Sequence, residues 1–262
     1  MRIGLIVVDD GIYTHQWVRD ILKLPRHNIC VCACLSPFYA RNFNPHKNLI
    51  NSINFRLRYY GLRASIKFYL LFLKNRAEAS TLNLNRQKRV SSVRALISHD
   101  KIPLVPIQNQ DVNHPDFLDK FKQYNPQVLL GVFSQKAELP LRTLAPLGCL
   151  NIHFSYLPDN AGREPVFWSL LEGKGYGLTI YRMGEVFDSG EILAQCRLAS
   201  DGLFTLDEAI KNICMHIPEV LTNALDKLER GTDTMVLKPK ALKGWPKPRD
   251  TRAFLDAGYT FC

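Results

Sequence analysis

The first 35 residues carry the pattern that most restricts the fold of this chain. Ile3–Val8 is an uninterrupted apolar run, as in a strand that is covered on both faces. Thr14–Leu24 has apolar residues at helical spacing, and Asn28–Leu35 is a second apolar run. A strand, a helix and a strand at this spacing form a βαβ unit, whose strands are parallel. The sequence therefore predicts an α/β domain with a parallel sheet.

The alternation of strands and helices resumes after residue 85. Further strands are predicted at Leu104–Ile107, Val128–Phe133, Cys149–His153, Gly177–Met183 and Glu191–Leu198. Helices are predicted at Lys88–Ser98, Pro115–Tyr124, Leu139–Ala145 and Pro165–Leu171. A capping box of Thr205 and Glu208 begins a long helix, which Pro218 should bend or break and Gly231 should end. The remaining Pro- and Lys-rich segment is predicted to be an extended tail that lies against the domain.

The formal net charge of +10 is unevenly placed. Between Asp20 and Glu78 there is no acidic residue, while the same interval holds ten Lys or Arg. A basic zone of this kind fits an anionic partner, such as a phosphate, a nucleic acid or a membrane surface. It fits equally well a basic loop in contact with solvent only.

The cysteines and the N-terminus indicate the compartment. Cys30, Cys32 and Cys34 alternate along one predicted strand, so their side chains should face the same side. No CxxC pair or disulfide pattern is present, which favours small buried residues in a reducing environment. A strand pattern begins at Arg2 with no signal peptide before it, and no apolar stretch reaches the ~20 residues of a spanning helix. We therefore expect a cytoplasmic protein.

Three polar residues between residues 148 and 195 could carry out chemistry. Asn151 and His153 are two apart on a strand, so they face the same side, and Asp188 lies in a turn between two strands. An amide and an imidazole directed at one point can stabilise a developing oxyanion. A nearby carboxylate can orient the imidazole and accept or relay a proton.

Each of these residues also has a structural interpretation. A single histidine on a strand is commonly a hydrogen-bonded core residue, and an Asp before Ser-Gly is commonly a turn residue. No Ser or Cys nucleophile stands beside the histidine, so the set suits direct acyl transfer to an external amine. One His and one Asp fall short of a metal ligand set, and no metal site is predicted.

The order and spacing of four motifs resemble the catalytic domain of the folate-dependent formyltransferases. These motifs are Asn151-Ile-His153, Ser155-Tyr-Leu-Pro158, Gly162 and Asp188-Ser-Gly190. The family includes glycinamide ribonucleotide, methionyl-tRNA and amino-sugar N-formyltransferases. The similarity extends from Met1 to about Leu198 and is weakest between Ser36 and Asn85. It implies a Rossmann-like formyltransferase fold, a mostly parallel sheet with helices on both faces, and N10-formyltetrahydrofolate as co-substrate.

The resemblance also implies roles for individual residues. Asn151 and His153 would polarise the formyl oxygen, and Asp188 would manage the protons of the attacking amine, through an oxyanion-stabilised tetrahedral intermediate. Two segments would line the folate pocket, mainly through backbone groups, although each could equally be a strand end or a plain loop. The implied folate-binding residues are Gly131, Phe133, Ser134, Gln135, Lys136, Ala137, Met183, Gly184, Glu185, Val186 and Phe187.

The acceptor side departs from the purine and tRNA enzymes of this family. Tyr156 stands where Leu is frequent, and Asp159-Asn160-Ala161 precede Gly162. Arg163 follows this loop and could contact the acceptor, or be an ordinary charge at the start of a helix. The candidate substrate-binding residues are Asp10, Gly11, Tyr13, Tyr156, Asp159, Asn160, Gly162 and Arg163.

The number of residues after Ala199 favours one class of amine acceptor over another. Methionyl-tRNA formyltransferases carry a further β-barrel domain, and the 63 residues after Ala199 are too few for a barrel and a long helix. We expect a catalytic domain at 1–200, with a basic helical insertion at about 36–85, and a C-terminal helix and tail at 201–262. This architecture resembles a sugar N-formyltransferase, whose acceptor is an amino sugar on a nucleotide diphosphate or a lipid carrier. The predicted partner is a phosphate-bearing small-molecule amine; tRNA is less favoured, DNA is not expected, and no oligomeric state is predicted.

The segment Ile53–Leu73 has two interpretations. Leu62, Ile66, Tyr69, Leu70 and Leu73 form one helical stripe, which Arg63, Lys67 and Lys74 flank. The favoured interpretation is a helix whose apolar side packs against its own domain. The alternative is peripheral contact with the inner face of a membrane, as for other basic amphipathic helices.

Two functions of other classes are alternatives to formyl transfer to an amino sugar or to tRNA. A formyltetrahydrofolate hydrolase would share the catalytic triplet, but such enzymes usually carry an N-terminal regulatory domain, and the first strand here begins at Arg2. A non-enzymatic binding protein on this fold is disfavoured by the complete triplet.

Overall fold

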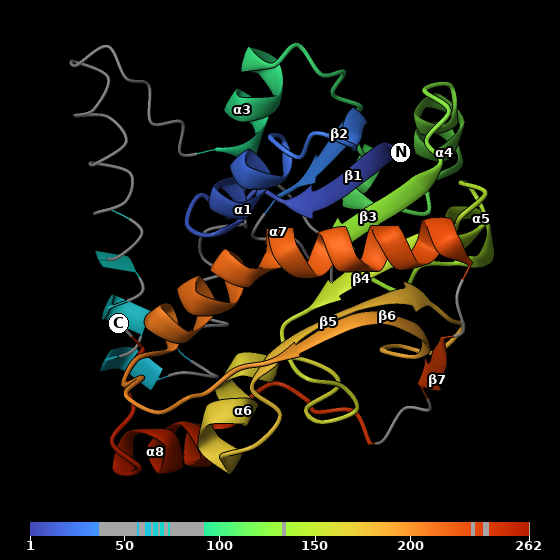
Figure 1. Cartoon of the computed structure of the whole chain (residues 1–262). Coiled ribbons are helices and arrows are strands. Elements are labelled where there is room, and N and C mark those ends of the chain that lie inside the picture. Colours follow the sequence, from blue (N-terminus) through green and yellow to red (C-terminus); the bar gives the residue numbers. More distant parts are fainter. Residues whose placement is uncertain are drawn as a thin grey trace.

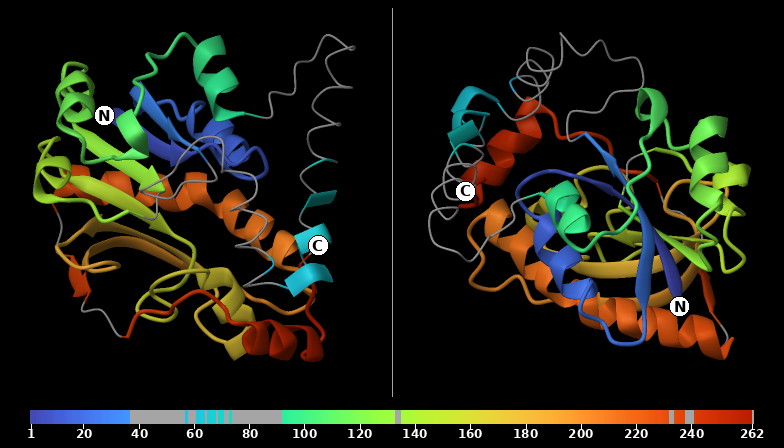
Figure 2. Two further views of the ribbon diagram at one scale, coloured as in Figure 1. Left: turned by 180° about the vertical axis from the view of Figure 1, so that it is seen from behind. Right: turned by 90° about the horizontal axis from the view of Figure 1, so that it is seen from above.

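The computed structural model describes residues 1–36, 92–132, 135–231, 234–237 and 241–261, with several residues between 57 and 73. A seven-stranded sheet carries helices on both faces (Figures 1 and 2). The strands are β1 (Arg2–Val8), β2 (Asn28–Leu35), β3 (Val128–Val132), β4 (Cys149–His153), β5 (Gly177–Met183), β6 (Gly190–Arg197) and β7 (Met235–Leu237). The α-helices are α1 (Thr14–Ile21), α3 (Val93–His99), α4 (Pro115–Lys122), α5 (Leu139–Arg142), α6 (Pro165–Glu172), α7 (Leu206–Arg230) and α8 (Pro248–Asp256).

The sheet changes from parallel to antiparallel at β4. Its strand order is β2-β1-β3-β4-β5-β6-β7. The first four strands in this order are parallel, and the remaining three pairs are antiparallel. The predicted Rossmann-like α/β fold is confirmed, with the parallel strands in the half that the βαβ pattern indicated. A strand with a parallel neighbour on one side and an antiparallel neighbour on the other therefore carries Asn151 and His153.

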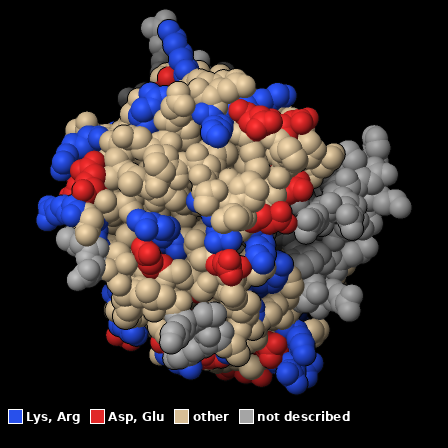
Figure 3. Space-filling view, turned by 90° about the vertical axis from the view of Figure 1, so that its right-hand side faces the viewer, with Lys and Arg blue, Asp and Glu red and all other residues tan. Residues whose placement is uncertain are grey.

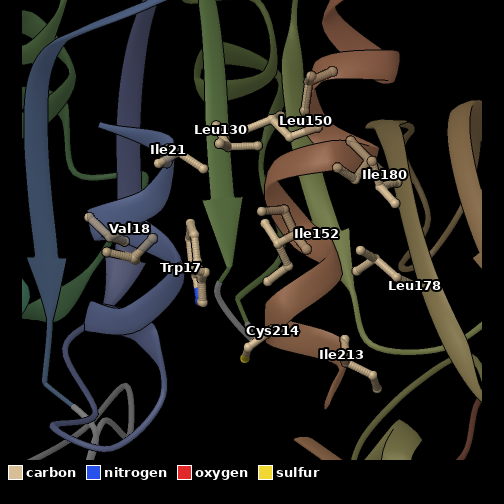
Figure 4. Packing of buried hydrophobic residues seen from close by; sticks show 14 of the residues in the cluster. Trp17, Val18, Ile21, Leu130, Leu150, Ile152, Leu178, Ile180, Ile213 and Cys214 are labelled. Carbon is tan, nitrogen blue, oxygen red and sulfur yellow. The ribbon is translucent and has the colours of Figure 1, made fainter. Parts of the chain in front are cut away.

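The two faces of β4 have different environments. Leu150 and Ile152 point into the main core, where α1 and α7 pack on the sheet (Figure 4). Cys149 belongs to a second core on the opposite face, beneath α4 and α5, and Figure 2 shows α7 and α4 on opposite sides of the sheet. Asn151 and His153 alternate with Leu150 and Ile152, so they lie on the second face. The apolar residues of β4 thus anchor the strand, while its polar residues are presented on the other side.

Helix α7 confirms the predicted start and end signals. The Thr205 hydroxyl accepts from the Glu208 N–H, the Glu208 carboxylate accepts from the Thr205 N–H, and Gly231 ends the helix in the left-handed conformation. Such caps contribute about 1 kcal/mol each. Pro218 lies inside the helix without ending it, and the helix is bent (Figure 1). The prediction of a bend or a break is thus resolved as a bend.

Cys30 faces the side of the sheet opposite to the predicted side. The pairing of β1 with β2 shifts register between Ile3 and Gly4, so that Cys30 has no counterpart in the ladder. A bulge of this kind inserts one extra residue and reverses the alternation of side chains. Cys32 and Cys34 lie in the main core, with their sulfur atoms 3.9 Å apart, whereas Cys30 packs against the second core. The prediction that all three share a face was therefore wrong.

Two further predictions of secondary structure were also wrong. Leu104–Ile107 forms only an isolated bridge between Leu104 and Cys32, and it is not a strand of the seven-stranded sheet. The predicted extended tail contains β7, which pairs with β6, and the helix α8. Phe254 of α8 stacks on Phe167 of α6, with their ring centroids 4.6 Å apart. The tail is therefore packed against the domain as regular structure.

The predicted basic insertion is described only at a few positions. The described residues between 57 and 73 are helical, and the apolar stripe is exposed, to 65% at Leu62 and 58% at Leu70. The favoured interpretation, that this stripe packs against its own domain, does not hold for these side chains. The rest of the predicted insertion lies outside the described residues. Among the helices that the structure describes, none is long and apolar enough to cross a membrane.

Candidate active site

The candidate catalytic residues meet where β4 is paired with β5. In this antiparallel pair Asn151 lies opposite Tyr181, and His153 lies opposite Thr179. Residues opposite each other in such a ladder have neighbouring side chains on one face of the sheet. The register therefore places the phenol of Tyr181 beside the amide of Asn151, over the face that α7 does not cover.

Asp188 reaches this face from the connection between β5 and β6. Its carboxylate accepts hydrogen bonds from the Tyr181 hydroxyl at Oδ1 (2.9 Å) and from the backbone N–H of Gly162 at Oδ2 (2.6 Å). The His153 Nδ1 atom is 3.6 Å from Oδ1, which is close contact but longer than a hydrogen bond. Asp188 is thus held by Tyr181 and Gly162 and lies against the imidazole, with its backbone in the left-handed region at φ 50°.

Asn151 has one end of its amide satisfied and the other free for a ligand. The Nδ2 atom donates to the Tyr181 hydroxyl at 3.1 Å. The Oδ1 atom is buried and makes no hydrogen bond with any residue that the structure describes. A buried polar atom without a partner is costly, and native structures usually satisfy it with water or a ligand. Because Asn151 also lines a pocket, this oxygen is available to a hydrogen-bond donor of a bound molecule or to water.

The imidazole of His153 is fixed by its surroundings. Its Nε2 atom lies 3.4 Å from the carbonyl oxygen of Asn160. The Asn160 side chain in turn donates to the Ser169 hydroxyl (3.0 Å) and the Lys174 carbonyl (2.8 Å), which holds the loop in place. Both ring nitrogens of His153 are thus close to oxygen atoms of the protein.

Tyr181 stays protonated in this environment. Burial raises the pKa of its hydroxyl well above the usual range, and the neighbouring Asp188 carboxylate raises it further. The hydroxyl is therefore a permanent donor to Asp188 rather than a group that exchanges protons.

A pocket opens beside this cluster, and most of the predicted folate-binding residues line it. Its walls are Asn151, Tyr181 and Asp188 together with Gln135, Lys136, Ala137, Met183, Gly184, Glu185, Val186 and Phe187. Gly131 is not part of the wall, but it pairs with Asn151 in the sheet. The predicted Phe133 and Ser134 lie outside the described residues. The two predicted segments, far apart in sequence, therefore meet around one opening next to the candidate catalytic residues.

The candidate substrate residues divide into two groups. Asn160 and Gly162 touch the catalytic cluster, through the contacts with His153 and Asp188. Asp10 and Tyr13 make their hydrogen bonds elsewhere: the Tyr13 hydroxyl donates to Asp207 of α7 at 2.8 Å. The structure thus does not bring Asp10 and Tyr13, or Gly11 between them, together with the catalytic cluster.

Asp10 also occupies the helix end where an anion could otherwise bind. Its Oδ1 atom accepts from the backbone N–H groups of Ile12, Tyr13 and Thr14, at 2.8–3.1 Å. The N-terminus of a helix is a ready site for a phosphate because such N–H groups are unpaired there. At α1 the chain's own carboxylate already satisfies them.

Tyr156 and Arg163 carry charge–aromatic contacts beside the loop. The Arg197 guanidinium lies 4.2 Å from the centre of the Tyr156 ring, and the Arg163 guanidinium lies 4.9 Å from that of Trp245. Asp159 lies in the same loop, and its backbone N–H donates to the Tyr156 carbonyl. Tyr156, Asp159 and Arg163 thus lie along the loop that carries Gly162, and the aromatic contacts of Tyr156 and Arg163 are made with Arg197 and Trp245.

A segment of the C-terminal tail supports the loop that holds Asp188. The Lys243 N–H donates to the Ala161 carbonyl (2.7 Å), and the Arg163 N–H donates to the Lys243 carbonyl (2.9 Å). Between them, a Cβ on Gly162 would lie 2.3 Å from the Lys243 oxygen, so only glycine fits. The tail and the catalytic carboxylate are thus connected through one glycine.

Sequence reasoning missed Tyr181 and this tail segment. Tyr181 had a usable signal, because it is the one phenol in an apolar strand, Gly177–Met183, and a buried hydroxyl needs a partner. Lys243 had no such signal, since it supports the loop through its backbone N–H and carbonyl. Its side-chain contacts with Glu172 and the Trp168 ring depend on residues that lie far away in sequence.

Comparison with known proteins identifies the family. A family model described as formyl transferase matches residues 70–213, which is more than half of the chain. The chain therefore belongs to the formyl transferase family, as the Asn-x-His and Asp-Ser-Gly motifs predicted. Enzymes of this family take the formyl group from N10-formyltetrahydrofolate, the predicted co-substrate.

Relatives and solved structures agree with this assignment. The chain is 32% identical to the methionyl-tRNA formyltransferase of Caldanaerobacter subterraneus subsp. tengcongensis, over 45% of the chain and 39% of that protein. It is 30% identical to that of Clostridioides difficile, over 54% of the chain and 46% of that protein. The match thus spans less than half the length of these relatives.

Two solved structures resemble the chain in fold. A glycinamide ribonucleotide transformylase 1 from Symbiobacterium toebii is 14% identical, with a TM-score of 0.56, covering 91% of this chain and 94% of that one. A sugar N-formyltransferase from a Shewanella species is 16% identical, with a TM-score of 0.54, covering 98% and 88%. At these identities the likeness concerns the fold alone.

Proposed function

We propose that this protein transfers a formyl group from N10-formyltetrahydrofolate to a primary amine by direct attack. The observation that carries this proposal is the cluster of Asn151, His153 and Asp188 beside a pocket, with the Asn151 oxygen buried and unpaired among the described residues. The residues form no nucleophile–base pair, which favours transfer without a covalent acyl-enzyme.

Each residue has one task in this reaction. The unprotonated amine attacks the formyl carbon, and negative charge gathers on the formyl oxygen. The second N–H of the Asn151 amide stabilises this charge, together with the His153 Nε2–H, whose contact with the Asn160 carbonyl is long at 3.4 Å. Each such donor is typically worth ~10²–10³ in rate. Asp188 accepts the proton of the amine and relays it, directly or through water, to the tetrahydrofolate nitrogen, which leaves protonated.

The folate is proposed to occupy the pocket between Gln135–Ala137 and Met183–Phe187. The pocket reaches Asn151 and Asp188, so a molecule in it can meet both groups. Val186 and Phe187 on its rim are exposed, to 54% and 43%, although both are apolar. An apolar ring system laid against them would cover this surface. Binding of tetrahydrofolate alone, measured by calorimetry with wild type and Phe187→Ser, tests this placement: equal affinity in the two proteins would contradict it.

The acceptor is proposed to be an amino sugar linked to a nucleotide diphosphate. A sugar N-formyltransferase structure shares the fold over 98% of this chain, which supports the same architecture, and its acceptor class is carried over as part of the proposal. On the side that carries α4, α5 and β7, Lys and Arg alternate with Asp and Glu (Figure 3), which gives no continuous basic surface there for tRNA phosphates. Asp10 fills the N-terminus of α1, so the diphosphate would be met by basic residues outside that helix end.

One assay separates this function from its alternatives. Tetrahydrofolate release is followed with no acceptor, with nucleotide-linked amino sugars, with glycinamide ribonucleotide and with methionyl-tRNA. Release that depends on an amino sugar supports the proposal. Release that requires methionyl-tRNA supports the tRNA enzyme, and release without any acceptor supports a hydrolase. No release with any of these amines would contradict the proposed activity.

Peripheral contact with an anionic membrane is proposed for the helical stripe. Leu62, Ile66, Tyr69 and Leu70 are exposed together, and the exposed Arg63 and Lys67 flank them. An apolar stripe with a basic border fits the interface of an anionic bilayer.

Sedimentation with vesicles tests this contact. Wild type should sediment with phosphatidylglycerol vesicles at low salt and less with phosphatidylcholine vesicles. The double variant Leu62→Ser/Leu70→Ser should lose this binding, while Met215→Ser, which removes an equally exposed apolar side chain from α7, should keep it. Wild type that stays in the supernatant with phosphatidylglycerol at low salt would contradict the proposal.

A further inference from the structure

The hydroxyl of Tyr181 lies at the centre of the candidate active site. It donates to Asp188 Oδ1 at 2.9 Å and accepts from Asn151 Nδ2 at 3.1 Å. Its side chain is 3% exposed, and its ring packs against Leu157, Ala161 and Ile192. The phenol is therefore fixed by apolar neighbours, and one oxygen atom connects the two residues that handle charge in the reaction.

The direction of these two hydrogen bonds is determined by Asp188. An ionised carboxylate only accepts, so the single proton of the Tyr181 hydroxyl is used in the bond to Asp188. The hydroxyl oxygen can then only accept from Asn151, which forces the amide nitrogen toward Tyr181. A flipped amide would place two acceptor oxygens against each other. The charge of the carboxylate thus determines which way the Asn151 amide faces.

We propose that Tyr181 is a positioning residue for formyl transfer, which holds the Asn151 amide in its donating orientation as long as Asp188 is ionised. The inference rests on the proposed function. The Tyr181 hydroxyl would couple Asp188, which accepts the amine proton, to Asn151, which stabilises the formyl oxygen.

Tyr181 neither gains nor loses a proton in this scheme. The bond between the amine nitrogen and the formyl carbon forms, and the bond between that carbon and the folate nitrogen breaks. The amine proton goes to Asp188, which passes it, directly or through water, to the folate nitrogen as that nitrogen leaves. Burial and the Asp188 charge raise the pKa of Tyr181, so its hydroxyl stays protonated throughout. When Asp188 takes the amine proton, its bond with Tyr181 loses the charge-assisted part, and the amide orientation is released.

The groups around Asp188 and Tyr181 determine how pH acts on them. Asp188 faces His153 from β4, Tyr181 from β5 and the N–H of Gly162 from the loop. Tyr181 is also near Cys149 of β4. Of these titratable groups, Asp188 is the one that accepts a hydrogen bond from the Tyr181 hydroxyl. A change in the pH profile on removal of that hydroxyl therefore reports on Asp188.

A matched pair of tyrosine variants tests the proposal. Tyr181→Phe removes the hydroxyl and keeps the ring. Tyr176→Phe is the control: Tyr176 is also 3% exposed, donates to the Ala209 carbonyl (2.9 Å) and accepts from Asn212 (3.1 Å), away from the site. Both variants lose one buried hydroxyl with two partners, so a purely structural loss should be similar in the two.

The two variants should differ in their pH profiles. In Tyr181→Phe we expect kcat to fall by about tenfold to a hundredfold, with the KM for the folate donor within about twofold of wild type. The acid limb of its kcat profile should move to higher pH by about one pH unit, because the ionised carboxylate has lost a donor. Tyr176→Phe should keep the wild-type profile. A Tyr181→Phe profile equal to that of wild type would overturn the proposal.

A second measurement does not depend on turnover. With ¹³C-labelled aspartate, the Asp188 carboxyl resonance is assigned by its loss in Asp188→Asn and followed against pH. Its titration midpoint should move to higher pH in Tyr181→Phe and not in Tyr176→Phe. If wild type transfers no formyl group, the proposed function fails, and this titration still decides the link between Tyr181 and Asp188. An unmoved midpoint would contradict that link even in an active enzyme.

Discussion

Among the residues that the structure describes, two tyrosine–aspartate pairs have nearly the same hydrogen-bond length and different surroundings. The Tyr13 hydroxyl donates to Asp207 at 2.8 Å, and the Tyr181 hydroxyl donates to Asp188 at 2.9 Å. In both tyrosines, burial and the adjacent carboxylate raise the pKa of the hydroxyl. In the first pair, Lys211 neutralises the other oxygen of Asp207 at 2.6 Å. In the second, the partners are a backbone N–H, an amide and an imidazole, and none of these is a permanent cation.

The difference separates a structural contact from a candidate site. The first pair joins α1 to α7, and its charge is satisfied within the protein. The second leaves a carboxylate and a buried amide oxygen that a ligand can meet at the wall of a pocket. A hydrogen-bonded carboxylate alone thus does not indicate a catalytic site. The indication comes from polar atoms at the pocket wall that can still bond to a ligand. The same substitution should therefore affect turnover in one pair and stability in the other.

The largest expected contrast is between the two aspartates. Asp188→Asn should abolish formyl transfer while tetrahydrofolate binding remains measurable, because the amide cannot accept the amine proton. Asp207→Asn should retain turnover and lower the free energy of unfolding by roughly 1–3 kcal/mol, because it leaves Lys211 without its partner. Steady-state kinetics and urea unfolding of both variants decide this. Near wild-type turnover in Asp188→Asn would contradict the catalytic assignment.

Removal of an asparagine partner sharpens the comparison. Asn151→Ala should lower kcat by about 10²–10³, as expected for the loss of one oxyanion donor. Asn212→Ala removes the amide that donates to Tyr176 and should leave kcat unchanged. The two variants lose the same kind of Asn–Tyr contact, so equal turnover in both would mean that Asn151 has only a structural role.

Glycine substitutions test the loop that holds Asp188. Gly162→Ala places a Cβ against the Lys243 backbone, at φ 109°, and should lower turnover about tenfold and stability by roughly 1–3 kcal/mol. Gly173→Ala, at φ 62° with no atom within 4 Å of the added Cβ, should cost about 1 kcal/mol and no turnover. Kinetics and thermal unfolding of both variants measure this. If turnover falls equally in the two, the contact between Gly162 and Asp188 does not explain the loss.

The smallest expected effect concerns Tyr13. Tyr13→Phe should lower the free energy of unfolding by about 1–2 kcal/mol, since one hydrogen bond to a charged group is lost. Turnover and the KM for the acceptor should stay at wild-type values, because the hydroxyl contacts Asp207 rather than the catalytic cluster. A raised KM for the acceptor would instead restore Tyr13 as a substrate-binding residue, as the sequence predicts.

The parts predictable from sequence are those set by local periodicity. The alternation of Asn151 with Leu150 and Ile152 places the polar side chains on one face, and the bounds of β4 and β5 agree with prediction. The parallel half of the sheet follows from strand, helix and strand in the first 35 residues. These features depend on neighbours within a few residues, which a single sequence contains.

The parts that were not predictable depend on tertiary register. The bulge at Cys30 is set by the pairing of β1 with β2, and no residue type announces it. Tyr181 acquires its role only because β5 runs antiparallel to β4 and brings it opposite Asn151. Strand β7 has three residues, too few for a visible alternation. The Asn160–Gly162 loop could be associated with the site by family motif, but its support by Lys243 could not.

The two main-chain hydrogen bonds of Lys243 have an evolutionary consequence. They hold the loop next to Asp188 through main-chain atoms, while the Lys243 side chain adds contacts with Glu172 and with the Trp168 ring. Substitutions that leave the main chain in place therefore keep these two bonds, whereas proline at position 243 would remove the N–H donor. New side chains can thus arise in this segment while Asp188 keeps its backbone support. The matched family region ends at residue 213, so this support lies outside the segment that the family model matches.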